Sequence, residues 1–336
     1  MRRSAIGLAT ALALVCGGAM AADKPAHTPW GDPDLQGLWS NASLTRLERS
    51  PGVTKLALTE DEAKAAEKAL LAWMAANDQP TPASQGAPPA ANDPGGYNSF
   101  WIDNGSRLGR VNGEARTSWV MDPPTGKVPY SAAAIAQMQQ AGMRQFGRFD
   151  NPESRSLGER CVVGFGSTSG PPMLNVLYNN NYQIAQSPGF VAIVVEMNHD
   201  ARIIRLGGSH LPAHVKPWMG DSVGHFEGET LVVETTNLNP GQRFAADVLH
   251  RLYLAPDSKV TERFTRLAKD EILYEFTVEE PHAYTQTWKG QIPLKASKGP
   301  MYEYACHEGN YSLPGILAGA RAQEKQAQET PAGGAQ

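Results

Sequence analysis

Three short segments of the chain gather acidic, basic and aromatic side chains, and these are the places where it could do chemistry. They are residues 196–202, 210–227 and 302–311. Imidazole and carboxylate groups can transfer protons near neutral pH, and neighbouring aromatic rings can hold an apolar substrate. The residue types therefore predict an acid–base site with an apolar lining.

Ten residues of these segments and their surroundings are the candidate site. We expect the catalytic acids and bases to be His199, Asp221, His225, His307 and Glu308. We expect the substrate-binding residues to be Tyr182, Arg202, Trp218, Tyr304 and Asn310. Asp221 could orient His225 or His214, although Asp221-Ser222 is equally typical of a turn before a strand. Asn198 and Asp200 favour a hairpin turn rather than a catalytic role.

A metal site is a weaker alternative. His210 and His214 are four residues apart, a spacing that brings two ligands together on a helix. Pro212 lies between them and argues against that helix. No zinc-protease or paired-cysteine motif accompanies them. We therefore expect no metal ion and no other cofactor.

The N-terminus and the cysteines point to export. Residues 1–21 combine two arginines, an apolar stretch and a small-x-small sequence that ends at Ala21, as in a cleaved signal peptide. Cys16 lies inside this segment, so the mature chain keeps Cys161 and Cys306. Two cysteines in an oxidising compartment predict a disulfide, and a catalytic Cys161 is the less favoured alternative. We expect a periplasmic or secreted protein.

Helical patterns are confined to the first half of the chain. Thr59 and Glu62 form a capping box before a helix that extends to residue 76, and Ser131 caps a second helix over residues 132–144. Residues 77–96 hold five prolines and read as a linker. We assign residues 22–173 to an irregular, helical N-terminal region and residues 318–336 to a disordered tail.

Residues 174–317 show the two-residue period of β-strands. An additional short strand is expected at residues 35–39. The expected strands of the second half are residues 174–178, 182–186, 190–197, 202–206, 230–235, 260–267, 272–278, 284–292 and 302–306. Short turns between most of them predict antiparallel pairing. The fold class is therefore mainly β: an antiparallel β-barrel or strongly curved β-sandwich, with the helical N-terminal half wrapped on it.

Four longer motifs resemble a family of secreted bacterial hypothetical proteins. They are residues 116–126 with Asp-Pro-Pro-Thr-Gly, 178–184 with Tyr-Asn-Asn-Asn-Tyr-Gln-Ile, 218–237 with Trp-Met-Gly-Asp-Ser and Glu-Gly-Glu-Thr-Leu-Val-Val-Glu-Thr-Thr-Asn, and 302–311 with Tyr-Glu-Tyr-Ala-Cys-His-Glu-Gly-Asn-Tyr. The resemblance implies a bacterial, exported protein. It implies no activity, cofactor or catalytic residues.

Composition narrows the functional classes. The formal net charge is −4 and the basic residues are scattered, which argues against nucleic-acid binding. No stretch after the signal peptide is long and apolar enough to span a membrane. We expect an exported enzyme, a lyase, hydrolase or isomerase, that acts on a small or oligomeric, partly apolar substrate by acid–base chemistry without a redox cofactor. The alternatives are a periplasmic β-barrel that binds an apolar ligand and a histidine-based divalent-metal protein.

Overall fold

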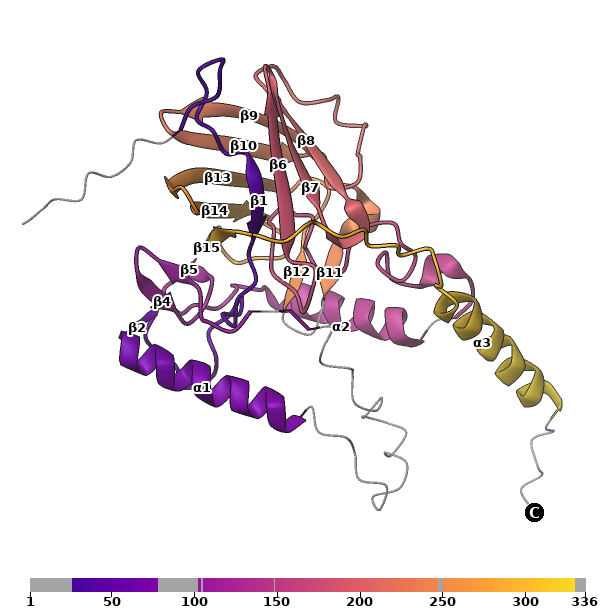
Figure 1. Ribbon diagram of the computed structural model, residues 1–336. Helices are drawn as coiled ribbons and strands as arrows, with labels where there is room; N and C mark the ends of the chain where they lie inside the picture. Colours follow the sequence, from indigo (N-terminus) through magenta and orange to yellow (C-terminus); the bar gives the residue numbers. More distant parts are fainter. Residues whose placement is uncertain (1–25, 78–101, 104, 148, 247–249, 330–336) are drawn as a thin grey trace, which may run out of the picture.

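The computed structural model describes residues 26–77, 102–103, 105–147, 149–246 and 250–329. A β-barrel forms its centre, with helices α1 (Glu60–Asn77), α2 (Ala132–Gly147) and α3 (Ser312–Glu329) arranged outside it (Figure 1). The expected signal peptide and most of the expected linker lie outside the described residues.

The barrel is closed and has nine strands. They follow the order β1 (Gly37–Ser40), β6 (Asn181–Ser187), β7 (Phe190–Val195), β8 (Ala201–Leu206), β9 (Asp221–Glu227), β10 (Thr230–Thr236), β13 (Lys259–Ala268), β14 (Glu271–Glu279) and β15 (Trp288–Ala296). Strand β1 pairs with both β6 and β15 and so closes the circle. The predicted β-barrel is confirmed, and its closing strand comes from the N-terminal half of the chain.

One strand pair differs from the antiparallel expectation. Strands β8 and β9 are parallel, so the barrel is mixed. Residues 207–220 lead from the end of β8 back to the start of β9. Parallel neighbours need a long crossover of this kind, whereas antiparallel neighbours need only a tight turn. The polar, glycine-containing β9 was not among the expected strands. Its Gly224 faces inward at a point where a Cβ atom would lie 2.9 Å from Ile204.

Alternation of buried and outward-facing residues fills the barrel with side chains. Every second residue of β14, from Ile272 to Val278, is buried. Aromatic rings contact one another in a row through the interior: Phe264 and Tyr274 are tilted, with ring centroids 4.9 Å apart, and Phe276 and Trp288 pack edge to face at 5.5 Å. These contacts leave the interior packed as a core rather than open as a ligand channel.

A charged cluster lies within this core. Arg202 of β8 donates two hydrogen bonds, of 2.7 and 2.9 Å, to the carboxylate of Glu262 on β13. Both side chains are fully buried, and Tyr274 donates a third hydrogen bond to Glu262. Burial acts to lower the pKa of Arg202, but Glu262 raises it above its ordinary value. Arg202 and the buried Tyr182 therefore support the barrel core, although we expected them to bind substrate.

Residues 165–176 close one end of the barrel, and we call them the plug. The amide of Met173 donates to the hydroxyl of Tyr274, and Tyr182 donates its hydroxyl hydrogen to the carbonyl of Thr168. Residues 174–178 were expected to form a strand but form none, and the apolar Leu174 and Val176 are instead buried in this plug. Any ligand that approaches this end meets the outer side of the plug.

The helices begin as their sequences predict. Thr59 and Glu62 exchange the two hydrogen bonds of a capping box at the start of α1. The hydroxyl of Ser131 accepts a hydrogen bond from the amide of Ala134 at the start of α2. The third helix, α3, occupies most of the region in which a disordered tail was expected. This segment is polar overall, but it is rich in alanine, glutamine, glutamate and lysine, which have high helix propensity.

The remaining elements are small. They include the three-stranded sheet of β2 (Ala57–Leu58), β4 (Glu114–Arg116) and β3 (Arg110–Val111), strand β5 (Val120–Asp122) beside β15, and the pair β11 (Phe244–Ala246) and β12 (Arg251–Tyr253). Three single 3-10 turns complete the described elements: Pro152–Ser154, Met197–His199 and Pro240–Gln242. Residues 302–306, an expected strand, form no strand and end in a bend at Cys306. In the described part of the chain, no helix is both long and apolar enough to cross a bilayer.

The predicted disulfide is confirmed. Cys161 and Cys306 are bonded and lie 145 residues apart in sequence. The bond joins the loop that precedes the plug to the segment that leads from β15 into α3. It therefore fixes the C-terminal segment against the closed end of the barrel.

Candidate functional site

A cavity lies at the plugged end of the barrel, and we call it the arginine cavity. Its volume is about 560 Å³. Helix α2, residues 153–166, the turn before β11, and both β11 and β12 contribute to its walls. The charged and amide side chains among its lining residues are Arg155, Arg160, Arg243, Glu153, Gln137, Gln140 and Gln242. Figure 1 shows α2, β11 and β12 together at this end.

The three arginines of this cavity differ in their partners. Arg155 is buried and donates a 2.6 Å hydrogen bond to the carboxylate of Glu159. Burial acts to raise the pKa of Glu159, but hydrogen bonds from Arg155 and Ser156 outweigh it and hold that pKa below its ordinary value. Among the described residues, neither Arg160 nor Arg243 pairs with a carboxylate. Two guanidinium groups therefore remain available to an anion from solution.

Aromatic side chains form the apolar part of the arginine cavity. Phe244 and Tyr253 face each other across the β11–β12 pair, and the guanidinium of Arg243 lies 5.9 Å from the centre of the Tyr253 ring. Trp218, from the crossover between β8 and β9, packs so closely on Gly241 that a Cβ atom there would lie 3.0 Å from the indole. The cavity thus combines positive charge with ring surfaces, a composition suited to an anion that has an apolar part.

Hydrogen bonds hold the loop of residues 164–169, part of which lines the arginine cavity. The carboxylate of Asp200 accepts hydrogen bonds from the amide of Gly164 and from the hydroxyl of Ser169. The hydroxyl of Thr168 donates to the carbonyl of Phe165. Asp200 therefore fixes this loop from outside the cavity and contributes no wall to it.

A second cavity, of about 390 Å³, adjoins the first, and we call it the disulfide cavity. Cys306 lines it, together with the segment that follows and the first turns of α3. Gly158 and Phe165 line both cavities. The two cavities therefore adjoin at Gly158 and Phe165.

Four of the ten expected site residues line these cavities. Trp218 lines the arginine cavity, and Tyr304, Glu308 and Asn310 line the disulfide cavity. The amide group of Asn310 donates to the backbone carbonyl of Glu159, so it also joins the two sides of the disulfide.

The expected acids and bases other than Glu308 lie elsewhere. His199, His225 and His307 are exposed, and none of them lines either cavity. His225 lies on the outer face of β9, where it contacts Glu227 at 3.2 Å. A shared acid–base centre of these histidines with Asp221 has no support in this arrangement.

Asp221 anchors the crossover between β8 and β9. Its carboxylate accepts hydrogen bonds from Arg205, from the amide of Leu211 and from the ring of His210. Burial acts to raise the pKa of Asp221, but these partners, led by Arg205, lower it to about 2. The same crossover carries Trp218, which lines the arginine cavity. Asp221 does not line the cavity and can influence it only through the position of the crossover.

The low pKa of Asp221 predicts an acid dependence of stability. Because the pKa falls on folding, the ionised carboxylate stabilises the protein by about 2 kcal/mol at pH 6, and this is lost as the pH falls from about 4 through 2. We expect Asp221→Asn to reduce the free energy of unfolding by about that amount at pH 6 and by about a third of it at pH 2.5. Urea unfolding of both proteins measures this. An equal difference at the two pH values would contradict it.

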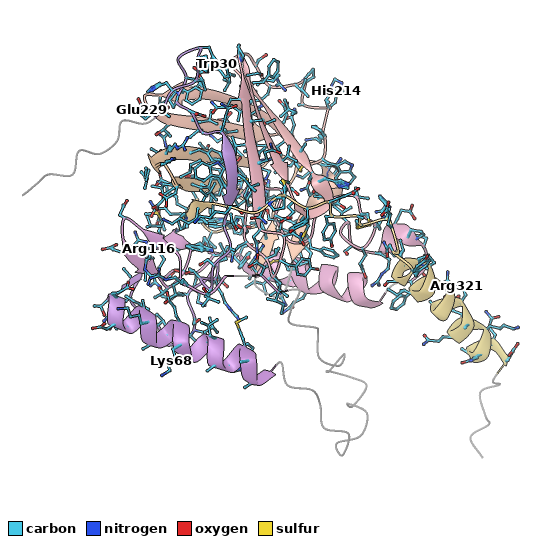
Figure 2. All side chains as sticks on the ribbon, in the orientation of Figure 1. Trp30, Lys68, Arg116, His214, Glu229 and Arg321 are labelled. Carbon is cyan, nitrogen blue, oxygen red and sulfur yellow. A yellow bond between two sulfur atoms is a disulfide. The ribbon has the colours of Figure 1, made fainter. Side chains whose placement is uncertain are left out.

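The structure does not group His210 and His214 into a metal site. His210 contacts Asp221 at 2.9 Å and Glu234 at 3.3 Å, while His214 is exposed further along the crossover (Figure 2). Within the described ranges, the one group spaced for a metal ion is Asp257, Glu280 and His282. The carboxylate of Glu280 already accepts backbone hydrogen bonds from His282 and Ala283, which commits it to the turn.

Sequence reasoning missed the arginines. Arg155 and Arg160 lie just before Cys161, and Arg243 lies more than eighty residues later in a short turn. No local motif connects them, and scattered basic residues predicted no common surface. The predicted disulfide was the available signal, because it places the loop at residues 155–165 against the residue 302–311 segment.

Comparison of the chain with known proteins finds no matching family model, no matching curated protein and no matching solved structure.

Proposed function

We propose that this protein binds a small organic anion in the arginine cavity. The observation that carries the proposal is the pair Arg160 and Arg243, two guanidinium groups that have no carboxylate partner among the described residues and that line one concave, aromatic-lined space. The volume of about 560 Å³ is within the range of sites for small molecules. This proposal follows the alternative in which the protein binds a ligand rather than acting as an enzyme. It differs from that alternative in one respect: the ligand carries a negative charge as well as an apolar part.

Binding is favoured over acid–base catalysis because of what lines the cavity. Its lining includes no imidazole, and Glu153 is its one carboxylate. The guanidinium group keeps its proton in proteins, so arginines recognise anions rather than exchange protons. The conversion of a substrate by lyase, hydrolase or isomerase chemistry would need groups from outside this lining.

We also propose that the protein is exported. The disulfide supports this location, because such bonds persist mainly in oxidising compartments. The signal peptide at residues 1–21, with cleavage near Ala21, remains part of the proposal. So does the resemblance to secreted bacterial proteins.

The test is a fluorescence titration with 1-anilinonaphthalene-8-sulfonate, an aromatic anion. We expect one dye per protein, and a dissociation constant at least about tenfold higher for Arg160→Gln and for Arg243→Gln, since hydrogen bonds to charged groups contribute about 1.5–3 kcal/mol. N-phenyl-1-naphthylamine, which lacks the sulfonate, should bind the variants and the parent protein equally.

The matched control is Arg46→Gln, which removes an exposed arginine that lines neither cavity. Its dissociation constant for the sulfonate dye should equal that of the parent protein. Equal binding of the anionic dye by the parent, Arg160→Gln and Arg243→Gln proteins would refute the proposed function.

A further inference from the structure

The disulfide cavity has a different chemical character from the arginine cavity. Its lining includes Leu313 and Ile316 of α3, together with the rings of Phe165 and Tyr304, and it includes no lysine or arginine. An adjoining space of about 390 Å³ with apolar side chains is suited to the hydrocarbon part of a ligand.

The polar groups of the disulfide cavity are largely committed to the protein. The two carboxylate oxygens of Glu159 accept hydrogen bonds from Arg155 and from the amide and hydroxyl of Ser156. Asn310 donates to the carbonyl of Glu159. Glu308 is exposed, so its carboxylate is solvated at the rim. These commitments leave the aliphatic and aromatic surfaces as the part of the cavity that a ligand can still desolvate.

The two cavities meet where the aromatic ring of Phe165 packs on Gly158. A Cβ atom at Gly158 would lie 2.5 Å from the ring of Phe165, so the ring packs directly on the backbone there. Phe165 is half-buried and lines both spaces. A ligand that extends from one cavity to the other would pass over this apolar ring, beside the Arg155–Glu159 ion pair, whose charges already satisfy each other.

We infer that the two cavities form one cleft for an amphiphile with an acidic head group and an unbranched hydrocarbon chain. The head group lies at Arg160 and Arg243, and the chain crosses Phe165 to reach Leu313 and Ile316. This inference rests on the proposed function, because it uses the same arginines for the head group. It adds the chain, its direction and the role of α3 as a wall of the site.

Competition of straight-chain carboxylates with the sulfonate dye tests the inference. Octanoate, decanoate and dodecanoate, each below its micelle concentration, should displace the dye with affinities that rise about threefold for each methylene, as expected for burial of most of each CH₂ group. Dodecylammonium, with the same chain and the opposite charge, should displace it at least about tenfold less well than dodecanoate.

Two variants locate the chain. Ile316→Ser and Leu313→Ser should each reduce the affinity for dodecanoate about tenfold and leave that for octanoate within about twofold. Leu317→Ser is the matched control, because this neighbouring leucine is as buried as Ile316 but lines neither cavity. These residues lie on the peripheral helix α3 (Figure 1), so the barrel should fold in all three variants, which circular dichroism checks.

The outcomes separate the inference from the proposed function. Equal affinity for the three carboxylates, with the dye still sensitive to Arg160→Gln, would overturn the inference and leave anion binding in place. Equal displacement by dodecylammonium would also overturn it. If dye binding does not respond to Arg160→Gln or Arg243→Gln, the proposed function fails, and the inference fails with it.

Discussion

Replacement of Glu262 with leucine is expected to lower the free energy of unfolding by about 3–5 kcal/mol. The change leaves the guanidinium of Arg202 buried without its two hydrogen-bonded carboxylate oxygens. It also removes the acceptor of the Tyr274 hydroxyl. Among the described residues the Nε atom of Arg202 already has no hydrogen-bond partner, so the change adds further unpaired N–H groups to a guanidinium that is not fully satisfied. Urea unfolding at pH 7 measures the loss.

The double variant Arg202→Met/Glu262→Leu is the control for this prediction. Apolar side chains of similar volume can replace a buried ion pair with little net change, because neither charge then needs to be desolvated. We expect the double variant to recover at least half of the stability that Glu262→Leu loses. A loss below about 1 kcal/mol for the single variant would show that the buried pair is not needed by the core.

Loss of the disulfide is the second change with a large expected effect. Cys161→Ser should lower the free energy of unfolding by about 2–5 kcal/mol, because the bond closes a loop across 145 residues and restricts the unfolded chain. The barrel strands pair without this bond, so the variant should still fold at low temperature. Urea unfolding of the oxidised protein and of Cys161→Ser measures the difference.

A reducing agent provides the matched comparison for the disulfide. It should lower the free energy of unfolding of the parent protein to that of Cys161→Ser. The free energy of unfolding of the double variant Cys161→Ser/Cys306→Ser should not change. Labelling of two free thiols in the native protein as isolated would contradict the bond itself.

Most of the barrel was predictable from the sequence, because most of its strands alternate between core-facing and outward-facing residues. Strand β14 is an example, with each buried residue followed by a more exposed one. Strand β9 was not predictable in this way. Its inward residues include Ser222 and Gly224, which local rules assign to turns. Their place in the barrel depends on Ile204 of β8, a contact that exists only after the parallel pair has formed.

The candidate site was predictable only in part. Aromatic residues next to polar ones identified Trp218 and Tyr304, and the two cysteines identified the segment that lines the disulfide cavity. Arg160 and Arg243 were not identified, because they line one cavity only in the folded protein, from the loop before the plug and from the turn before β11, rather than through sequence spacing. Arg202 was expected to bind substrate. It instead forms a buried ion pair with Glu262, which lies on a strand about sixty residues later in the sequence, and so belongs to the core.

The most direct measurement of the central claim is a crystal structure with 4-bromobenzoate, an aromatic carboxylate whose bromine gives an anomalous signal. We predict one principal bromine peak inside the arginine cavity, with the carboxylate hydrogen-bonded to the guanidinium groups of Arg160 and Arg243. The same crystals of the Arg160→Gln/Arg243→Gln double variant should lack the peak. A principal peak elsewhere on the molecule, or an undiminished peak in the double variant, would contradict the account.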